Sequence, residues 1–428
     1  MKKRLFVLSL STLLLSSCGS PARDIIDMDI YALNNVNKPL NTYVSNIDGR
    51  YLNALQQFSE DFYQLIDQKQ NQVFSPISIS TCYSMTYEGS NTETKTQLAS
   101  LLHYDESLNY APLVKDALLA ASYEYQTDGK VDNKLDVSQA YFIDNSFTDY
   151  INEDYLSLLT DYYFADAFKG TLNSDEMHEL LAEYINQKTN NFLKVNKEDF
   201  KDYGGVLWLL NTIYVKGQWM YQFSDAADIK DNFYDADNNP TRTTFMRSSF
   251  YNYVLESDDY LITTLPLMKG LNFTVLLPKK NDVSILNDKN AINNLLNYRN
   301  IKMSLYNIEL KMPLFKIQSE YDLKDVFESI GITLPFSAVG ADFSKMLNQK
   351  ATDDGVKLFI GKSKHVAGLE VNHDGLEAAA YTINAYEATS APFEGDTIKF
   401  NMDHPFAFVL TDYHNLPLFM GRVTNLND

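Results

Sequence analysis

The sequence predicts an α+β protein with one large folded domain, and two observations lead to this prediction. Helical and strand-like segments are interspersed along the chain without the regular alternation that builds a parallel α/β sheet. From residue 51 to the end no stretch has the composition of a linker, and no internal repeat occurs. Of the 428 residues, 45% are hydrophobic, which is ample for a buried core. We therefore assign residues 51–428 to a single domain.

The helices are predicted from apolar residues that recur at helical spacing. Leu55, Phe58 and Phe62 share one face of the first helix. The second helix has a clear start, because Ser75 can cap its N-terminus and Pro76 suits its first turn. We expect helices at about 51–66, 76–88, 92–102, 107–124, 148–163, 174–193, 283–298 and 321–330.

Short runs rich in β-branched and aromatic residues predict the strands. Most of these runs are only five to ten residues long and lie between two predicted helices. We expect strands at residues 73–74, 135–143, 206–215, 273–277, 308–317, 356–360 and 406–410.

The N-terminus has the features of a secretory signal. Three basic residues at 2–4 precede an apolar run at 5–15, which is too short to span a bilayer. The run ends in Leu15-Ser16-Ser17-Cys18-Gly19, which resembles the lipobox of bacterial lipoproteins. In that motif the cysteine thiol takes a diacylglycerol. A simple secretory signal that contains an accidental cysteine is the alternative.

These features predict where the protein goes. We expect residues 1–17 to be a lipoprotein signal peptide and Cys18 to be lipidated. Residues 18–50, which are rich in Asn, Asp and Ser, would then form a flexible tether. The protein would be anchored through this lipid to the outer face of a bacterial membrane, in the cell envelope.

Composition excludes several kinds of partner. The formal charge of −20 repels phosphate backbones, so we expect neither nucleic acid nor a polyanionic cofactor, and no cofactor is predicted. Cys82 is the one cysteine besides Cys18, so no internal disulfide can form once Cys18 is lipidated. It lies in a mostly apolar helix and is predicted to be a small core residue rather than a nucleophile.

The sequence contains no arrangement of residues that is typical of an enzyme. None of the six histidines is paired at the spacing of a helical zinc site. Neither a G-x-S-x-G motif nor a phosphate-binding glycine-rich loop occurs. We therefore predict that the protein is not an enzyme and has neither catalytic residues nor a metal site.

The segment after Gly375 is the most unusual part of the chain. Residues 376–391 contain no Gly and no Pro, and Ala, Thr and Ser are frequent. A surface loop of that length normally contains turn residues. This one keeps every backbone N–H and could therefore complete a β-ladder. An alternating pattern would place Leu376, Ala378 and Ala380 on one face, whereas an ordinary alanine-rich helix is the alternative.

Five motifs, in order, resemble those of the serpin family. The likeness extends over nearly all of residues 51–428. The motifs are Phe74-Ser75-Pro76-Ile77-Ser78-Ile79, the run from Asn211 to Trp219, the hinge Gly375-Leu376-Glu377-Ala378-Ala379-Ala380, the run from Phe400 to Phe406, and the closing strand from Leu418 to Val423.

This resemblance implies a serpin fold with three β-sheets, eight to nine helices and an exposed reactive-centre loop. It also implies a suicide-substrate inhibitor. A serine or cysteine endopeptidase attacks the loop, and the cut loop inserts into the central sheet while the protease is held as an acyl-enzyme. The expected partner is therefore a protease, and we expect the inhibitor itself to be a monomer.

The resemblance also assigns the reactive bond. Counting from the hinge glycine places it at Thr389-Ser390, with Ala388-Thr389 and Ser390-Ala391 as alternatives. Small residues there suit an elastase-like, subtilisin-like or papain-like protease, whereas Tyr386-Glu387 would suit a chymotrypsin-like one.

The resemblance assigns two further groups. Ser75, Ser78, Asn211 and His365 match the family's shutter, a buried polar cluster that controls the opening of the sheet, and Trp219 matches the breach at its top. Two positions depart from the family pattern. His373 replaces a glutamate, and Leu376 replaces the small hydroxyl residue that enters the sheet first. If Leu376 slowed insertion, the chain would act partly as a substrate, so a non-inhibitory serpin that acts as a cell-surface binding protein is the alternative.

Overall fold

The computed structural model describes residues 31–34, 38–127, 129–376 and 396–426. Nine α-helices lie within these residues, in agreement with the predicted number. They are α1 (Gly49–Leu65), α2 (Pro76–Glu88), α3 (Thr92–Leu102), α4 (Ala111–Ala120), α5 (Glu153–Tyr163), α6 (Asp175–Lys188), α7 (Lys289–Leu296), α8 (Leu323–Glu328) and α9 (Gln349–Asp353).

Side-chain caps fix the starts of the helices that matter most for the site. The Ser75 hydroxyl accepts a hydrogen bond from the backbone N–H of Ser78, and Pro76 occupies the first turn of α2, as predicted. Ser174 caps α6 in the same way by accepting from Met177. Both caps satisfy backbone donors that have no partner within their helix.

The described strands form two sheets. Those of the first, central sheet are β1 (Tyr31–Asn34), β3 (Ser122–Thr127), β4 (Lys130–Asp144), β5 (Asp166–Gly170), β6 (Leu207–Gln218), β12 (Phe315–Asp322), β13 (Lys364–Val371) and β14 (Gly375–Leu376). Those of the second are β2 (Gln72–Phe74), β7 (Ile229–Tyr234), β8 (Pro240–Glu256), β9 (Tyr260–Pro266), β10 (Asn272–Pro278), β11 (Ser304–Pro313), β15 (Thr397–Asn401), β16 (Phe406–Thr411) and β17 (Pro417–Val423).

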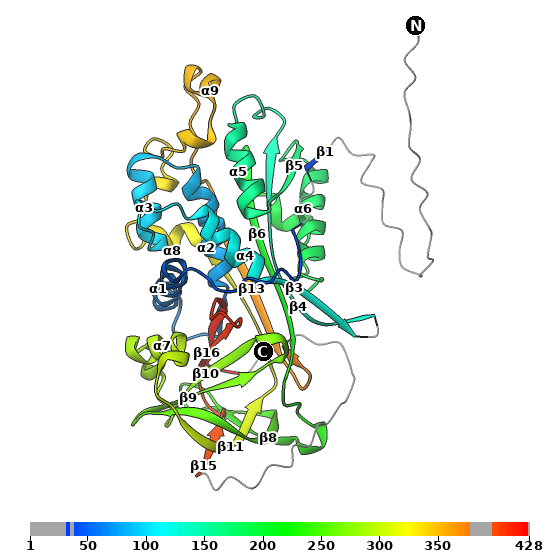
Figure 1. Cartoon of the computed structure of the whole chain (residues 1–428), viewed down its shortest axis with the longest axis vertical. Helices are drawn as coiled ribbons and strands as arrows, with labels where there is room; N and C mark the ends of the chain where they lie inside the picture. Colours follow the sequence, from blue (N-terminus) through cyan, green and yellow to red (C-terminus); the bar gives the residue numbers. More distant parts are fainter. Residues whose placement is uncertain (1–30, 35–37, 128, 377–395, 427–428) are drawn as a thin grey trace.

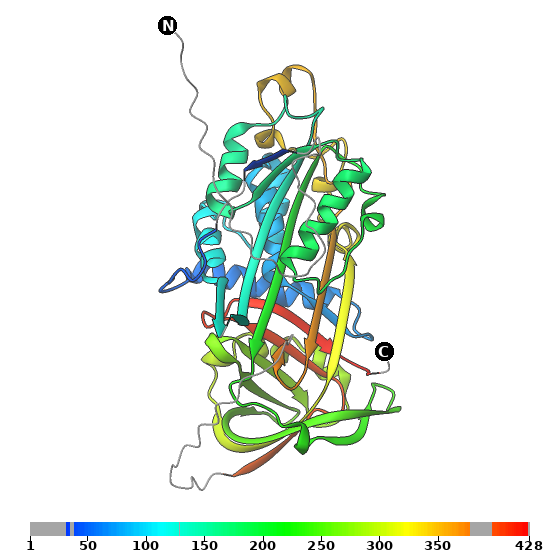
Figure 2. The ribbon, with the colours of Figure 1, turned by 90° about the vertical axis from the view of Figure 1, so that its right-hand side faces the viewer.

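The central sheet has the strand order β1-β5-β4-β6-β14-β13-β12, with β3 paired to β4. Figures 1 and 2 show α6 against one face and α2 behind the other, and α2 packs on β6. Alternating residues of β4 therefore enter two different cores. Tyr141 and Ile143 belong to the large core that α1 and α2 cover, whereas Ala140 and Phe142 belong to a smaller core beneath α6.

The second sheet bends along its longest strand. β8 pairs with β7 and β11 over most of its length, and its last three residues, Val254–Glu256, pair with β9. The two halves, β15-β11-β8-β7 and β9-β10-β16-β17-β2, correspond to the second and third of the three expected sheets. The half that contains β15, β11 and β8 lies at the end of the molecule opposite α9 (Figure 1).

Two predicted strands were wrong, and one long strand was missed. Residues 356–360 form no strand and run as irregular chain, and residues 308–317 are divided between β11 and β12, which are separated at Leu314. β8 was not predicted, because residues 240–256 lack a continuous apolar face along most of their length.

The segment before α1 is packed more closely than the predicted tether. We call residues 31–34 and 38–48 the N-terminal strap. β1 pairs with the edge strand β5, and Lys38 Nζ donates to Asp136 Oδ1 on β4 at 2.7 Å. Burial lowers the pKa of Lys38, while the Asp136 carboxylate opposes that shift. The packed part of the chain therefore begins before residue 51.

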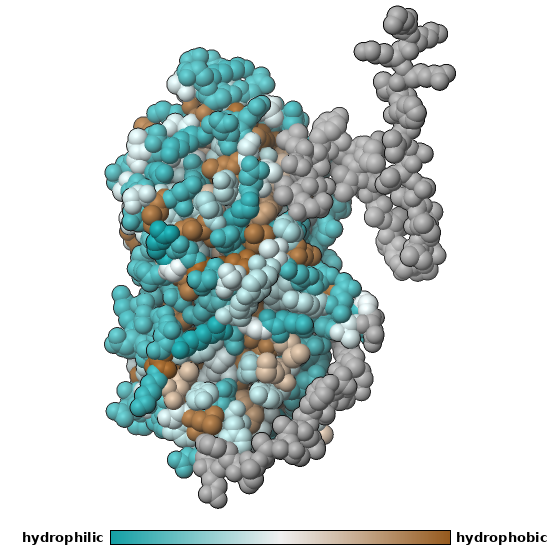
Figure 3. All heavy atoms as spheres, viewed as in Figure 1, coloured by the Kyte–Doolittle hydropathy of each residue, from teal (hydrophilic) through white to brown (hydrophobic). Residues whose placement is uncertain are grey.

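The surface seen in Figure 3 is mainly hydrophilic, with small apolar patches between charged side chains. Within the ranges that the structure describes, no helix combines the length and apolar character needed to cross a bilayer.

Candidate functional site: the gap in the central sheet

The hinge already lies in the central sheet. β14 consists of Gly375 and Leu376, and it pairs with β6 on one side and β13 on the other. Leu376 lies opposite Gly217 and opposite Val371, and it is only 1% exposed. The first side chain of the hinge therefore does not have to enter the sheet during insertion.

Glycine is required at the start of β14. Gly375 has a φ of +153°, a region that side-chain-bearing residues rarely adopt. A Cβ atom there would lie 1.9 Å from the carbonyl oxygen of Gly217. Both groups belong to the backbone of the sheet, so neither can move aside easily. Gly375 is thus the point at which the chain can turn into the space between β6 and β13.

A hydrogen-bonded turn holds this glycine in place. The Asn372 side-chain oxygen accepts from the backbone N–H groups of Asp374 and Gly375 at 3.0 and 3.2 Å. Trp219 is buried above β6, and its indole N–H donates to the Asn372 carbonyl at 2.8 Å. Trp219, predicted at the breach, therefore anchors the turn that leads into β14.

His373 also takes part in this turn. Its Nε2 lies 3.0 Å from both carboxylate oxygens of Asp228 and 3.5 Å from Asp225. The residue that departs from the family pattern therefore binds carboxylates, in keeping with the change from an acidic to a basic side chain.

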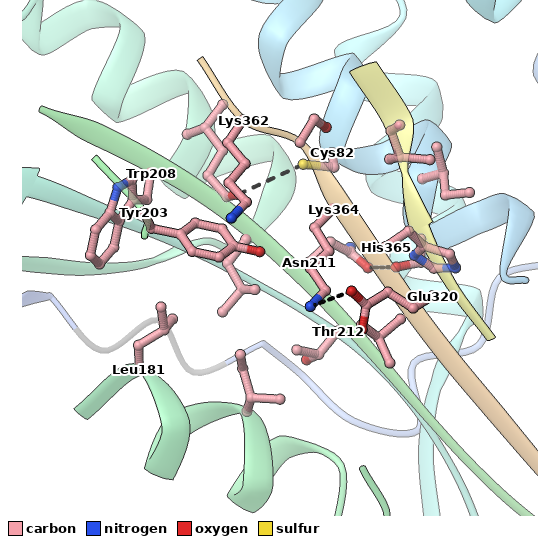
Figure 4. Close-up of a pocket in the computed structure, with 18 of the residues that line it drawn as sticks. Cys82, Leu181, Tyr203, Trp208, Asn211, Thr212, Glu320, Lys362, Lys364 and His365 are labelled. Carbon is pink, nitrogen blue, oxygen red and sulfur yellow. Dashed lines mark hydrogen bonds and ion pairs between the residues drawn. The ribbon is translucent and has the colours of Figure 1, made fainter. Parts of the chain in front are cut away.

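Below β14 the sheet is open. In the described part of the chain, β6 and β13 are joined only through the two residues of β14. Beneath it lies a cleft of about 1290 Å³ that both strands line, together with α6 and much of the segment at residues 192–206. Figure 4 shows Trp208 and Tyr203 at one end of this cleft and Asn211 and His365 further along it. Among the described strands, none other than β14 pairs with this edge of β13.

The four predicted shutter residues lie together beside the gap. The backbone N–H of Ser75 donates to His365 Nε2 at 3.1 Å, and the Ser78 hydroxyl donates to the side-chain oxygen of Asn211. His365 also stacks on Tyr321 of β12. Because His365 is buried away from water, its pKa is lowered to about 3, and the ring is neutral at physiological pH.

The shutter retains unused hydrogen-bonding capacity. The side-chain N–H₂ of Asn211 and the hydroxyl of Thr212 are buried in β6 and have no hydrogen-bond partner among the residues that the structure describes. An unpaired buried donor costs about 1–3 kcal/mol. A new polar group that arrived in the gap would therefore be stabilised there.

Cys82 contacts this region without any sign of reactivity. Its Sγ approaches the carbonyl oxygen of Leu209 at 3.8 Å, and burial raises the pKa of the thiol to about 12. A neutral thiol is a poor nucleophile, as predicted, but Cys82 is partly buried against the large core and lines the cleft instead of lying inside the core. Among the residues that the structure describes, no group of three or more histidine, cysteine or acidic side chains could hold a metal ion.

The geometry agrees with a comparison to protein families. The model of the family described as "Serpin (serine protease inhibitor)" matches residues 53–426. The chain belongs to the serpin family. The resemblance inferred from five short motifs is therefore confirmed. Serpins are generally protease inhibitors rather than catalytic enzymes.

Known serpins are similar to this one over nearly its whole length. Serpin-ZX of Arabidopsis thaliana is 28% identical over 381 residues, which cover 84% of this chain and 93% of that protein. Iripin-8 of Ixodes ricinus is 26% identical and covers 95% of this chain and 97% of its own. The solved structure of tengpin, a thermophilic serpin in its native state, has a TM-score of 0.73 at 25% identity, with 93% of this chain and 100% of that chain covered.

Several predicted site residues lie outside the described residues. They are the remainder of the hinge, the reactive bond and the lipidated cysteine, namely Glu377, Ala378, Ala379, Ala380, Thr389, Ser390 and Cys18.

Motif matching missed the partners that hold the hinge. Asn372 and Asp228 are ordinary polar residues in the sequence, and no spacing rule links position 228 to position 373. Gly217 gave a partial signal, because a glycine within a strand often marks the close approach of another backbone.

Proposed function

We propose that this serpin is a suicide-substrate inhibitor that traps a serine or cysteine endopeptidase as an acyl-enzyme, through insertion of its cleaved loop into the central sheet. One observation carries the proposal. β6 and β13 already hold the first two residues of an inserted strand, and the cleft beneath them is lined by backbone ladders and by the shutter. Strand addition to such a site supplies main-chain hydrogen bonds along both neighbours.

The register of β14 extends to the inserted strand. Leu376 lies opposite Gly217 and Val371, and antiparallel partners change by one residue per step. Ala378 would therefore lie opposite Val215 and Leu369, which are both buried in the large core. The small residues of the hinge would face the tightly packed side of the sheet.

The same register brings a hydroxyl group to the shutter. Six residues beyond Leu376, Thr382 would lie opposite Asn211 and His365, on the same face of the sheet. The Thr382 hydroxyl could then accept from the unpaired N–H₂ of Asn211. This would satisfy a donor that has no partner in the described structure.

One sequence feature supports the class of target protease, and a second supports the trapping step. Small side chains surround the proposed reactive bond at Thr389-Ser390, which suits an elastase-like, subtilisin-like or papain-like protease. An inserted strand from Leu376 to Thr389 would be about 46 Å long. The tethered protease would be carried about that distance, so its active site would be distorted before water could release it.

We propose that the inhibitor acts as a monomer on the outer face of a bacterial membrane, held by a lipid on Cys18. In that place it would shield the cell envelope from host or competitor proteases. The lipobox-like motif and the apolar segment before it support this location.

The proposal is tested by incubation with elastase-like, subtilisin-like and papain-like proteases. A band of the summed mass that survives SDS supports it, and mass spectrometry of the released peptide identifies the cut bond. The cleaved molecule should also melt at a markedly higher temperature, because the inserted strand fills the gap. A cleaved band without a complex, and with an unchanged melting temperature, would support a non-inhibitory cell-surface binding protein instead.

A further inference from the structure

Large side chains from several segments meet on the surface beside the N-terminal strap. The hydroxyl of Tyr413, in the turn between β16 and β17, donates to the carbonyl of Val44 on the strap at 2.7 Å. Gly270 packs so closely against Tyr413 that a Cβ atom there would clash with it. Next to Gly270, the ammonium of Lys269 lies 4.1 Å from the ring centre of Tyr125 on β3. The strap, the two turns and β3 therefore form one continuous surface.

Four segments contribute exposed side chains to this surface. The backbone N–H of Asn41 donates to the carbonyl of Ser122 at 2.9 Å, so the strap residues on either side of Asn41 lie along β3. We call this surface the tyrosine patch and define it by Leu40, Tyr43, Tyr125, Met268, Lys269 and Tyr413. Its five uncharged side chains are large, yet each is between 39% and 83% exposed. A group of large exposed side chains of this kind marks a contact surface.

The segments of the tyrosine patch are poor in acidic residues, although the whole chain carries −20. Three of them contain neither Asp nor Glu, namely residues 38–47, 266–271 and 413–418. The acid before Tyr125 is Glu124, which pairs with Lys134 at 2.9 Å. The acid before Tyr413 is Asp412, which is buried and lies 3.0 Å from His414. The repulsion that keeps an acidic surface away from anionic headgroups is therefore weak here.

The proposed lipid on Cys18 would bring this side of the molecule to a bilayer. Tyr31, at the start of β1, follows Cys18 by thirteen positions, and thirteen residues span at most about 47 Å. The strap is the first part of the described chain after the lipid. A surface held on so short a tether meets the membrane at high effective concentration, so even a weak contact is occupied.

The side chains of the patch suit the boundary between headgroups and acyl chains. Tyrosine is enriched at this depth, because its ring is apolar and its hydroxyl is polar. Leu40 and Met268 can bury apolar area at the same depth, while the ammonium of Lys269 stays near the lipid phosphates.

We propose that the tyrosine patch rests on the bilayer to which Cys18 is attached. The proposal rests on the membrane location proposed above and is independent of the trapping mechanism. It gives the molecule an orientation. In Figure 1 the strap passes β3 near the middle of the long axis, whereas β15, the strand after the reactive loop, lies at one end. A protease can therefore reach the loop while the patch is in contact with lipid.

The first test measures the depth of the patch in a membrane. The chain from Cys18 onward is coupled through the Cys18 thiol to a maleimide phospholipid, in phosphatidylcholine vesicles that contain brominated lipid. Cys82 does not compete, because burial raises the pKa of its thiol to about 12. Tyr43→Trp places a reporter in the patch, and Tyr253→Trp is the matched control, at a tyrosine that is 55% exposed on β8.

The parent chain supplies the emission of the two native tryptophans, which is subtracted. Brominated lipid should quench the tryptophan introduced at position 43 and leave the one introduced at position 253 unchanged. Equal quenching at the two positions would overturn the proposal.

The second test removes apolar side chains from the patch and uses the same chain without the coupled lipid. Leu40→Ser with Met268→Ser should lower the partition coefficient onto phosphatidylcholine vesicles about tenfold or more. Ile330→Ser with Val339→Ser is the control, because both residues are exposed outside the patch, and its partition and melting temperature should match the wild type.

An unchanged partition coefficient in the patch variant would contradict the proposal. Neither test needs lipidation in the cell, because the first attaches the lipid chemically and the second uses none. A chain that carries no lipid in the cell would refute the proposed location, whereas the two vesicle measurements decide on the patch.

Discussion

Lowering the pH should reduce the free energy of unfolding through His365, a member of the shutter. His365 is neutral in the folded protein, with a pKa of about 3, and would regain its ordinary value of 6.5 when unfolded. Between these two pKa values the unfolded state binds more protons than the folded state. The free energy of unfolding therefore falls as the pH falls below 6.5, whereas above that pH the contribution of His365 is fully present. At pH 5 this one group should remove about 2 kcal/mol from the free energy of unfolding.

The comparison uses His365→Gln, whose side-chain oxygen can still accept from the backbone N–H of Ser75 but does not titrate. Urea unfolding would be followed at pH 7.5 and 5.0 through the fluorescence of Trp208 and Trp219, which both lie at the central sheet. Other titrating groups are common to both proteins and cancel. The wild type should lose about 2 kcal/mol more than the variant over this interval. Equal losses in the two proteins would refute a buried neutral histidine.

Three further changes test the hinge, the register and the anchor. Gly375→Ala should destabilise the native form by about 1–3 kcal/mol or more, because alanine rarely adopts the φ of Gly375 and its Cβ would clash with the backbone of Gly217. Gly49→Ala is the control: open space surrounds Gly49, so the melting temperature should not fall. Ala380→Glu should turn the inhibitor into a substrate, because its carboxylate would have to lie beside Ala367, which is 3% exposed in the core; continued trapping would disprove the assigned register. Cys18→Ala should move the protein from the membrane fraction to the soluble fraction, and a variant that stays with the membrane would argue against lipidation.

The sequence predicted those parts of the fold whose signals are local. The helix that starts at Ser75 and Pro76 was predicted because its cap and its first proline are adjacent in the chain. The helix at Thr92–Leu102 was predicted at its observed bounds from spacing alone. By contrast, β8 is stabilised by its neighbours β7, β11 and β9, so its own residues need not show a continuous apolar pattern.

In the candidate site, too, contacts between residues that are distant in the sequence could not be predicted from local signals. His365 and Ser75 are 290 positions apart, and only the family motifs linked them before the structure placed them in hydrogen-bonding distance. The position of Leu376 could not be predicted from its size. Whether a leucine slows insertion depends on whether it starts outside or inside the sheet, and the paired position of β14 places it inside. That position depends on pairing with β6, which is distant from β13 and β14 in the sequence.

The pairing of β1 with β5 has a consequence for protein crowding. A β-strand that has no neighbour on one side can recruit a strand from another molecule, which begins aggregation. Here β5 is covered by a strand from the same chain. β1 is then the outermost strand, and with only four residues it offers few backbone groups for pairing. If the proposed lipid anchor held many copies on one membrane, this short edge would limit strand pairing between them.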